Sequence, residues 1–239
     1  MFNAREEAEK IVSFIKDVFA ERPAFRGAMV GISGGKDSLI CAALCAKALG
    51  AGGVLGVLMP NGEQHDIRDA QETVRYLGIP SQTVNIGWAY KELLKAVGDK
   101  VAPITAQNIP PRLRMTTLYA IAQERQYLVC NTSNLSEITI GYTTKWGDNV
   151  GDFAPLAHLT KTEVVEVGVA LGLPLALVLK TPADGLTGVS DENWLGFSYN
   201  ELDDYIRNAL DSVPAEVAAR IENRIATNRH KRLPIPTVV

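Results

Sequence analysis

Short apolar runs alternate with amphipathic segments along most of the chain. Residues 28–32, 53–60 and 127–132 are largely apolar, and residues 82–86 form a shorter run of the same kind. Such runs are typical of buried parallel strands, which have no solvent-exposed face. Between the runs, apolar residues recur every three or four positions, which predicts helices. The predicted helices cover residues 4–20, 36–50, 67–79, 89–97, 111–124, 161–172, 199–210 and 214–227.

This alternation predicts one α/β domain spanning residues 1–239, with a doubly wound, Rossmann-like parallel sheet and helices on both faces. Ligands bind such sheets at the carboxyl ends of the strands. The loops that follow residues 32, 59, 86 and 131 are therefore the candidate ligand-binding loops. Residues 141–160 are glycine-rich and polar, and we expect them to form a long functional loop.

Composition excludes several classes of protein. The formal net charge is −3 for 239 residues, which argues against a broad basic surface for nucleic acid. No apolar run reaches the roughly 18 residues of a membrane span, and the N-terminus lacks the basic and apolar parts of a secretory signal. We therefore expect a soluble cytoplasmic protein with no nucleic-acid or membrane partner. Cys41, Cys45 and Cys130 form no CxxC pair, and we expect them to be buried.

The segment GISGGKDS, residues 31–38, is open to three interpretations. As a serine-hydrolase elbow it would make Ser33 the nucleophile, with His230 as its base. Only one predicted strand precedes it, however, and the oxyanion partner motif is absent. As an NTPase phosphate loop it would need a Ser or Thr after Lys36, where Asp37 stands, and a glycine in place of Val30.

The third interpretation is a pyrophosphate-binding turn. The segment joins a strand to a helix, so backbone N–H groups and a helix N-terminus meet at a strand's carboxyl end. Gly34 and Gly35 permit close approach of the backbone, and the Ser33 and Ser38 hydroxyls could add donors. Asp37 suits the first turn of a helix and could hold magnesium through its oxygens. A turn that merely connects strand and helix remains the alternative.

The segment SGGKDS resembles the loop of the N-type ATP pyrophosphatases, which cleave ATP between the α and β phosphates. Further segments, in order along nearly the whole chain, resemble ammonia-dependent NAD synthetases. These segments are NIPPRLRMTTLYAIAQ (108–123), NTSNLSE (131–137), GYTTKWGDNVGDFAPL (141–156), LTKTEV (159–164), KTPADGL (180–186), DENWLGFSY (191–199) and HKR (230–232).

That resemblance implies an adenine nucleotide alpha-hydrolase-like fold and the conversion of deamido-NAD, ATP and ammonia to NAD, AMP and pyrophosphate. The nicotinate carboxylate would attack the α-phosphate, and ammonia would then displace AMP from the acyl-adenylate. A carboxylate does not accept ammonia at neutral pH until it carries a better leaving group. The family also forms homodimers that bind substrate across the interface, to which the helices at 4–20 and 111–124 could contribute.

The resemblance assigns residues to ATP and magnesium. Asp37 and Glu137 match the magnesium ligands, and Lys161 matches a catalytic lysine on the ATP phosphates. Without the resemblance, Glu137 would be a helix-start carboxylate, and Lys161 would simply follow the helix cap Thr160. The predicted ATP site comprises Gly31, Ser33, Gly34, Gly35, Lys36, Asp37, Ser38, Met59, Thr132, Lys161 and Ala183.

One position departs from the family pattern. Ala183 stands where Ser or Thr usually contacts an ATP phosphate. The missing hydroxyl removes one hydrogen bond to a charged group, which is worth about 1.5–3 kcal/mol. We therefore expect weaker ATP binding and retained activity.

The resemblance also assigns a site for deamido-NAD. Asp148 would lie near the reacting carboxyl, where it could hold ammonium or accept a proton, and is the second predicted catalytic residue. On their own, the basic residues near the C-terminus would be no more than a solvated tail. The predicted deamido-NAD residues are Arg112, Lys145, Asp148, Asp152, His230 and Lys231.

The chain leaves no room for a glutaminase domain, so we expect free ammonia as the nitrogen source.

Two kinds of alternative to an NAD synthetase stay open at this point. Another ATP pyrophosphatase, such as a tRNA-thiolating enzyme or a GMP-synthetase-type amidase, would share the loop, although thiolation favours cysteine pairs and a basic surface. A non-catalytic nucleotide sensor would need the loop but not two magnesium carboxylates together with Lys161.

Overall fold

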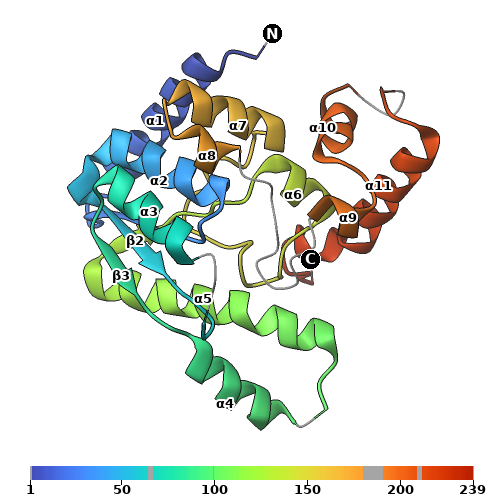
Figure 1. Ribbon diagram of the computed structural model, residues 1–239, viewed down its shortest axis with the longest axis horizontal. Coiled ribbons are helices and arrows are strands. Elements are labelled where there is room, and N and C mark those ends of the chain that lie inside the picture. Colours follow the sequence, from blue (N-terminus) through green and yellow to red (C-terminus); the bar gives the residue numbers. More distant parts are fainter. Residues whose placement is uncertain (1, 64–66, 99, 180–190, 209–211, 239) are drawn as a thin grey trace.

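The computed structural model describes residues 2–63, 67–98, 100–179, 191–208 and 212–238 (Figure 1). Within these ranges four parallel strands form one sheet in the order β3-β2-β1-β4. The strands are β1 (Gly27–Gly31), β2 (Val54–Leu58), β3 (Ser81–Thr83) and β4 (Tyr127–Val129). Strand β1 has β2 on one side and β4 on the other, so the strand order reverses beside β1. This confirms the predicted doubly wound sheet, and a ligand is expected at the carboxyl ends of β1 and β4.

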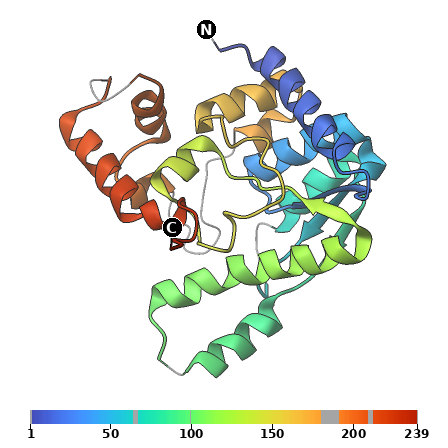
Figure 2. The same ribbon diagram turned by 180° about the vertical axis from the view of Figure 1, so that it is seen from behind.

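Helices cover both faces of the sheet, as predicted (Figures 1 and 2). Side chains alternate along β1: Ala28 and Val30 pack against α1, α2 and α7, whereas Met29 packs against α5 on the opposite face. The helices of these two layers are α1 (Ala4–Ala20), α2 (Lys36–Leu49), η1 (Ala51–Gly53), α3 (Ile67–Leu77), α4 (Gly87–Val97), α5 (Pro103–Arg125), α7 (Lys161–Ala170) and α8 (Leu175–Val178).

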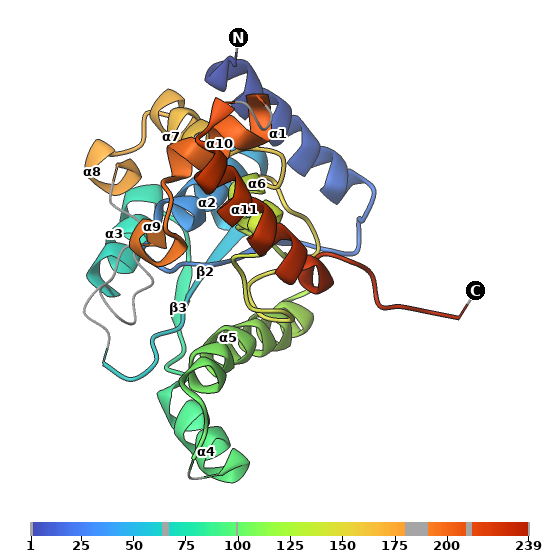
Figure 3. The same ribbon diagram turned by 90° about the vertical axis from the view of Figure 1, so that its right-hand side faces the viewer.

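The C-terminal helices form a third apolar cluster beside the sheet (Figure 3). Leu195, Leu202 and Ile221 are buried there against Ile140. The elements are α6 (Leu135–Ile140), α9 (Asp191–Leu195), α10 (Tyr199–Asn208), α11 (Ala215–Thr227) and η3 (Arg229–Lys231). No helix in the described ranges is both long enough and apolar enough to cross a membrane.

Helix α5 differs most from its prediction. It begins at Pro103, eight residues before the predicted start at residue 111, and it runs through Pro110 and Pro111. A proline inside a helix removes a hydrogen-bond donor and crowds the carbonyl four residues earlier, so the sequence argues against a helix that extends before residue 111. In the structure Ile109 and Pro110 are buried, so packing holds the helix together across the prolines.

Three short helices, α6, α8 and α9, were not predicted. They contain six, four and five residues, too few to show a helical repeat of apolar positions. Residues 141–160, predicted as a loop, contain no helix or strand, and an isolated bridge between Cys130 and Phe153 joins them to the end of β4.

Candidate functional site

The loop from Gly31 to Ser38 joins β1 to α2 at the β1/β4 edge of the sheet. Gly34 has φ of 85°, a left-handed conformation that glycine adopts readily. The Ser33 hydroxyl accepts a hydrogen bond from the Gly35 amide (3.1 Å), and the Ser38 hydroxyl donates to the Gly35 carbonyl (2.9 Å). Both hydroxyls therefore fix the shape of the loop, a role that the sequence analysis did not assign to them.

Free donors remain at the N-terminus of α2. The amides of Gly34, Lys36 and Asp37 have no acceptor in the part of the chain that the structure describes. Such free amides at a helix N-terminus are the arrangement that an anion site requires. The hydrolase interpretation finds no support, because among the described residues no histidine hydrogen-bonds to Ser33, and His158 pairs with Glu7 (2.8 Å).

Three predicted residues from distant parts of the chain form an ion triad. The Lys161 Nζ atom lies 2.6 Å from Asp37 Oδ2 and 3.0 Å from Glu137 Oε1. Asn134 adds a hydrogen bond from its Nδ2 atom to Asp37 Oδ1 (3.2 Å). These side chains come from the N-terminal ends of α2, α6 and α7, which meet beside the carboxyl ends of β1 and β4. Lys161 is 5% exposed, so the triad is largely shielded from solvent.

Helix capping orients the triad. The Asn134 side chain accepts from the Glu137 amide (3.0 Å), and the Glu137 carboxylate faces back to the Asn134 amide (3.4 Å). Thr160 and Glu163 form the same reciprocal arrangement at the start of α7. Such capping boxes fix the first turn of a helix, which is where Glu137 and Lys161 lie. Thr160 is therefore a helix cap, as one interpretation of the sequence held, while Lys161 also takes part in the triad.

The triad shifts the pKa values of its members. Burial raises the pKa of Glu137 to about 7; the Lys161 charge opposes that rise, and the Asp37 charge adds to it. Burial alone would lower the pKa of Lys161, but the Asp37 and Glu137 charges outweigh it and raise the pKa above its ordinary value. Lys161 is thus a cation at neutral pH. Burial and the nearby Lys161 charge lower the pKa of Lys36 in the loop.

The pKa of Glu137 predicts a pH dependence of folding stability. Its ordinary value is 4.5, so between pH 4.5 and about 7 the folded protein binds more protons than the unfolded chain. The free energy of unfolding therefore falls as pH rises through this window. Glu137→Gln, which keeps the capping contact without the charge, is expected to remove that fall. Chemical unfolding at pH 5 and pH 8 tests this, with Glu72→Gln on the exposed face of α3 as control. Curves for wild type and Glu137→Gln that fall in parallel would contradict the assignment.

Four of the predicted substrate residues also come together. Arg112 Nε donates to the Lys145 carbonyl (3.1 Å), and Lys145 Nζ donates to the His230 carbonyl (2.9 Å). Lys231 Nζ donates to two carbonyls of the 141–160 loop (2.8 and 2.9 Å), and burial lowers its pKa. The C-terminal basic segment is therefore bound to the loop, which Arg112 in turn joins to α5, and it is not a free solvated tail.

Asp148 joins the 141–160 loop to the residues that directly precede Asn134. Its Oδ1 atom accepts from the Thr144 amide (2.6 Å), and its carbonyl accepts from Asn131 Nδ2 (3.0 Å) and Ser133 Oγ (3.1 Å). Asn131 and Ser133 follow β4 directly before Asn134, so the loop is fixed next to the triad. The pKa of Asp148 is raised because nearby protein atoms displace solvent from its carboxyl group, although the residue keeps an exposed surface, and the Thr144 hydrogen bond opposes the rise.

Asp152 is oriented toward the sheet. Its Oδ2 atom accepts from the Val129 amide (2.7 Å), and its Oδ1 atom accepts from the Tyr119 hydroxyl (3.3 Å). Burial and the Asp152 charge raise the pKa of Tyr119 to about 12. Asp152 therefore fastens the loop to β4 and α5. A pocket of about 490 Å³ lies at this junction, lined by Met115, Thr116, Tyr119, Trp146 and Val150.

Two other residues of the predicted ATP site lie just after strands. Met59 is buried at the end of β2, and its carbonyl accepts from Arg114 Nε (3.1 Å), a contact that the sequence did not indicate. Thr132 is half-buried just after β4. Ala183 lies outside the described residues.

A buried hydrogen-bond network next to Lys161 was not predicted. Asp191 is 8% exposed and accepts from the Tyr142 hydroxyl (3.0 Å) and the Tyr199 hydroxyl (3.4 Å). The Tyr199 ring centroid lies 5.2 Å from Lys161 Nζ, a cation–π contact. Burial and the Glu137 charge raise the pKa of Tyr199. The segment DENWLGFSY carried the only signal, since it was recognised as a motif without any residue being given a role.

The donor set fits magnesium bound together with a substrate phosphate. Asp37 and Glu137 present carboxylate oxygens to one point, where Lys161 now lies between them. No group of three or more His, Cys, Asp or Glu side chains that could hold a metal occurs in the described ranges. Magnesium is commonly held by one or two carboxylates plus substrate phosphates, so this pair suits it better than a metal held by protein ligands alone.

Comparisons with known proteins give matches over nearly the whole chain. The family model "NAD synthase" matches residues 7–235. The NH(3)-dependent NAD(+) synthetase of Finegoldia magna is 38% identical over 232 residues, covering 96% of this chain and 94% of that protein. Among solved structures, NMN synthetase from Francisella tularensis superposes with a TM-score of 0.92 at 33% identity and covers 100% of this chain and 99% of that one. The NH3-dependent NAD synthetase from Campylobacter jejuni gives 0.84 at 26% identity and covers 100% of both chains.

Proposed function

The chain belongs to the NAD synthase family, and from that premise we propose that it amidates the nicotinate carboxylate of deamido-NAD. The reaction would consume ATP and free ammonia and give NAD, AMP and pyrophosphate. The observation that carries the proposal is the meeting of Asp37, Glu137 and Lys161 beside an anion-binding loop at the switch point of the sheet. As the reaction draws on ATP and on a nucleotide precursor, we place it in the cytoplasm.

The loop and the triad would act on ATP. Free amides at the N-terminus of α2 can bind the triphosphate, and Lys36 and Lys161 can offset the negative charge of the departing pyrophosphate. Asp37 and Glu137 would hold Mg²⁺, which when bound would neutralise phosphate charge and favour in-line attack. The Asp191 network holds the Tyr199 ring against Lys161 and so would keep that ammonium in position.

The 141–160 loop would act on the pyridine nucleotide. The carboxylate oxygen attacks the α-phosphorus and releases pyrophosphate; ammonia then attacks the carbonyl carbon, and AMP leaves with the former carboxylate oxygen. The incoming nitrogen must lose a proton, and the Asp148 carboxylate is the group that we assign to accept it. The Asp148 backbone carbonyl is bonded to Asn131, which follows β4. Arg112, Lys145 and the C-terminal basic residues would attract the negatively charged pyridine nucleotide.

A second candidate substrate is nicotinate mononucleotide. It carries the same carboxylate on the same ring, so the chemistry of activation and amidation is unchanged. The NMN synthetase of Francisella tularensis, which superposes with a TM-score of 0.92, favours this alternative. The mononucleotide lacks the adenylate half, and the two substrates therefore differ only in the contacts made beyond the first phosphate.

An omission assay tests the proposed function. Pure protein is mixed with ATP, magnesium, ammonium and deamido-NAD, each is left out in turn, and NAD, AMP and pyrophosphate are measured together. We expect equal amounts of the three products and no product when any component is missing. Nicotinate mononucleotide in place of deamido-NAD decides between the two substrates by kcat/KM. AMP and pyrophosphate formed without an amide product would refute the proposed acceptor, and robust turnover with glutamine would refute the ammonia assignment.

We further propose that two copies of the chain associate through α4 and α5. Large apolar side chains are exposed on both helices, among them Val97 at 56% and Ile104 at 58%. The sequence analysis named residues 4–20 and 111–124 as helices that could contribute to the interface; this proposal keeps the second, as part of α5, and puts α4 in place of the first. The exposed apolar residues of the two helices are Trp88, Leu93, Val97, Ile104 and Tyr119.

Charges placed on this surface should separate the copies. Val97→Lys with Ile104→Lys is expected to change the sedimenting species from two 25.9 kDa chains to one, and to lower activity if substrate binds across the interface. Val169→Lys is the matched control, because Val169 is 47% exposed on α7. A wild-type protein that sediments as a monomer, or a double variant that stays dimeric, would contradict the proposal.

A further inference from the structure

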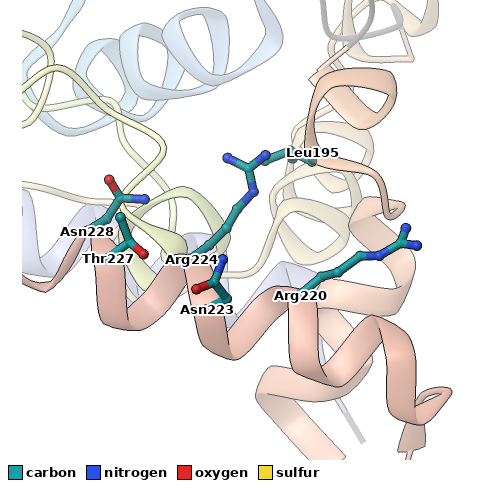
Figure 4. Close-up of a pocket in the computed structure, with 6 residues that line it drawn as sticks. All are labelled: Leu195, Arg220, Asn223, Arg224, Thr227 and Asn228. Atoms are coloured by element: carbon teal, nitrogen blue, oxygen red, sulfur yellow. The ribbon is translucent and has the colours of Figure 1, made fainter.

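A pocket of about 270 Å³ lies between α9 and α11 (Figure 4). One wall is the face of α11 that carries Arg220 and Arg224, and Leu195 at the end of α9 forms the opposite side. None of the assigned ATP, magnesium or deamido-NAD residues lines it. The lining residues are Leu195, Arg220, Asn223, Arg224, Thr227 and Asn228.

Among the described residues, no carboxylate forms a salt bridge that offsets the positive charge of the pocket. It contains two guanidinium groups and no acidic side chain, and neither arginine forms a salt bridge within the described ranges. The acidic residue in the middle of α11, Glu222, faces α10, where burial, the Glu222 charge and a hydrogen bond to Glu222 raise the pKa of Tyr205. Two cations at the mouth of one pocket favour an anionic ligand.

Both arginines are held in place yet keep donors free. Arg220 Nη1 donates to the Gly196 carbonyl (3.0 Å), and Arg224 Nη2 donates to the Trp194 carbonyl (3.1 Å). A guanidinium has five N–H groups, so most of the donors remain for a ligand. The Arg224 guanidinium also lies 4.1 Å from the centre of the Trp194 ring, which fixes its plane.

The pocket adjoins the predicted substrate residues. Asn228, at the end of α11, donates from Nδ2 to the Ile140 carbonyl (3.0 Å), directly before the 141–160 loop. Tyr142 of that loop packs on Trp194, with ring centroids 5.4 Å apart. The Arg224 charge also lies close enough to Lys231 to help lower the pKa of its ammonium. A ligand bound to Arg224 would therefore lie next to the residues assigned to the pyridine nucleotide.

We propose that this pocket is a phosphate-binding subsite in which Arg224 and Arg220 supply the charge and Asn223 and Thr227 supply neutral hydrogen-bond donors. The planar, forked guanidinium matches the oxygens of a phosphate. The phosphate can come from the pyridine-nucleotide substrate, in which case the inference rests on the proposed function, or from free phosphate or pyrophosphate.

The test uses Arg224→Gln, Arg220→Gln and the milder Asn223→Ala, which leaves the contact of Arg224 with Trp194 intact. Gln keeps a donor for the α9 carbonyls but removes the charge. The first arm is calorimetric titration of the whole protein with inorganic phosphate and with pyrophosphate. The second arm compares KM for nicotinate mononucleotide with KM for nicotinate riboside, which lacks the phosphate. Arg75→Gln, on the exposed side of α3, is the control.

If the pocket binds the phosphate of the substrate, KM for the mononucleotide should rise about tenfold or more in Arg224→Gln, while KM for the riboside and KM for ATP should stay unchanged. If the pocket binds free phosphate or pyrophosphate, the variants should lose that binding, while KM for the mononucleotide and KM for the riboside should stay unchanged. If no variant alters either anion binding or the mononucleotide KM, the proposal is overturned. Absence of amidation by the wild-type enzyme would count against the proposed function alone, because the calorimetric arm still decides whether the pocket binds phosphate.

Discussion

Lys161→Met is expected to lower kcat by about 10²–10³-fold, the usual cost of removing one preorganised group that stabilises charge in the transition state. Methionine has a similar length but brings no charge to the departing pyrophosphate. The ammonium lies 2.6 Å from Asp37 and 3.0 Å from Glu137. Among the described residues, no other cation forms a salt bridge with these two carboxylates. A kcat within tenfold of wild type would contradict the role of Lys161.

The same substitution should also destabilise the fold. Removing one partner of a fully buried ion pair costs about 3–5 kcal/mol. The loss should be smaller here, because Asp37 and Glu137 are each 18% exposed and Glu137 can take up a proton. The loss should therefore shrink at lower pH. Unfolding curves at pH 5 and pH 8 measure it, and near-ultraviolet circular dichroism confirms that the assayed variant is folded.

Asp37→Asn is the second substitution with a large expected effect. Asn has almost the same shape, but it removes one of two oxygen anions available to magnesium and one of two partners of Lys161. We expect kcat to fall about 10²-fold or more and the half-saturating magnesium concentration to rise at least tenfold. Titration of activity with magnesium separates these two effects.

The matched control for Asp37→Asn is Asp204→Asn, on an exposed position of α10. It should leave both the rate and the magnesium requirement unchanged. An Asp37→Asn enzyme with wild-type magnesium dependence would show that Asp37 is not a metal ligand, even if its rate were low.

Local features of the fold could be predicted from the sequence because local physics decides them. The apolar run before GISGGKDS forms β1, the helix after it ends at Leu49 with Gly50 as its C-cap, and the three cysteines are buried and free. Helix α5 could not be bounded in the same way. Its prolines argue against a helix, and only the burial of Ile109 and Pro110 shows why the helix continues.

The candidate site depends on contacts that no local pattern contains. Asp37, Glu137 and Lys161 are far apart in the sequence, and only the family resemblance placed them in one site before the structure did. The network around Asp191 was missed because only folding brings the Tyr142 and Tyr199 hydroxyls to this buried carboxylate. The donor role predicted for the Ser33 and Ser38 hydroxyls overlooked the possibility that they bond the loop itself.

The most direct test of the central claim follows one oxygen atom. Deamido-NAD labelled with ¹⁸O in the nicotinate carboxylate is incubated with protein, ATP, magnesium and ammonium. The ¹⁸O content of AMP and of pyrophosphate is then measured by mass spectrometry. An acyl-adenylate predicts that AMP carries one ¹⁸O atom and that pyrophosphate carries none. Label in pyrophosphate or inorganic phosphate, or ADP in place of AMP, would mean that the carboxylate attacks another phosphorus atom and would contradict the account.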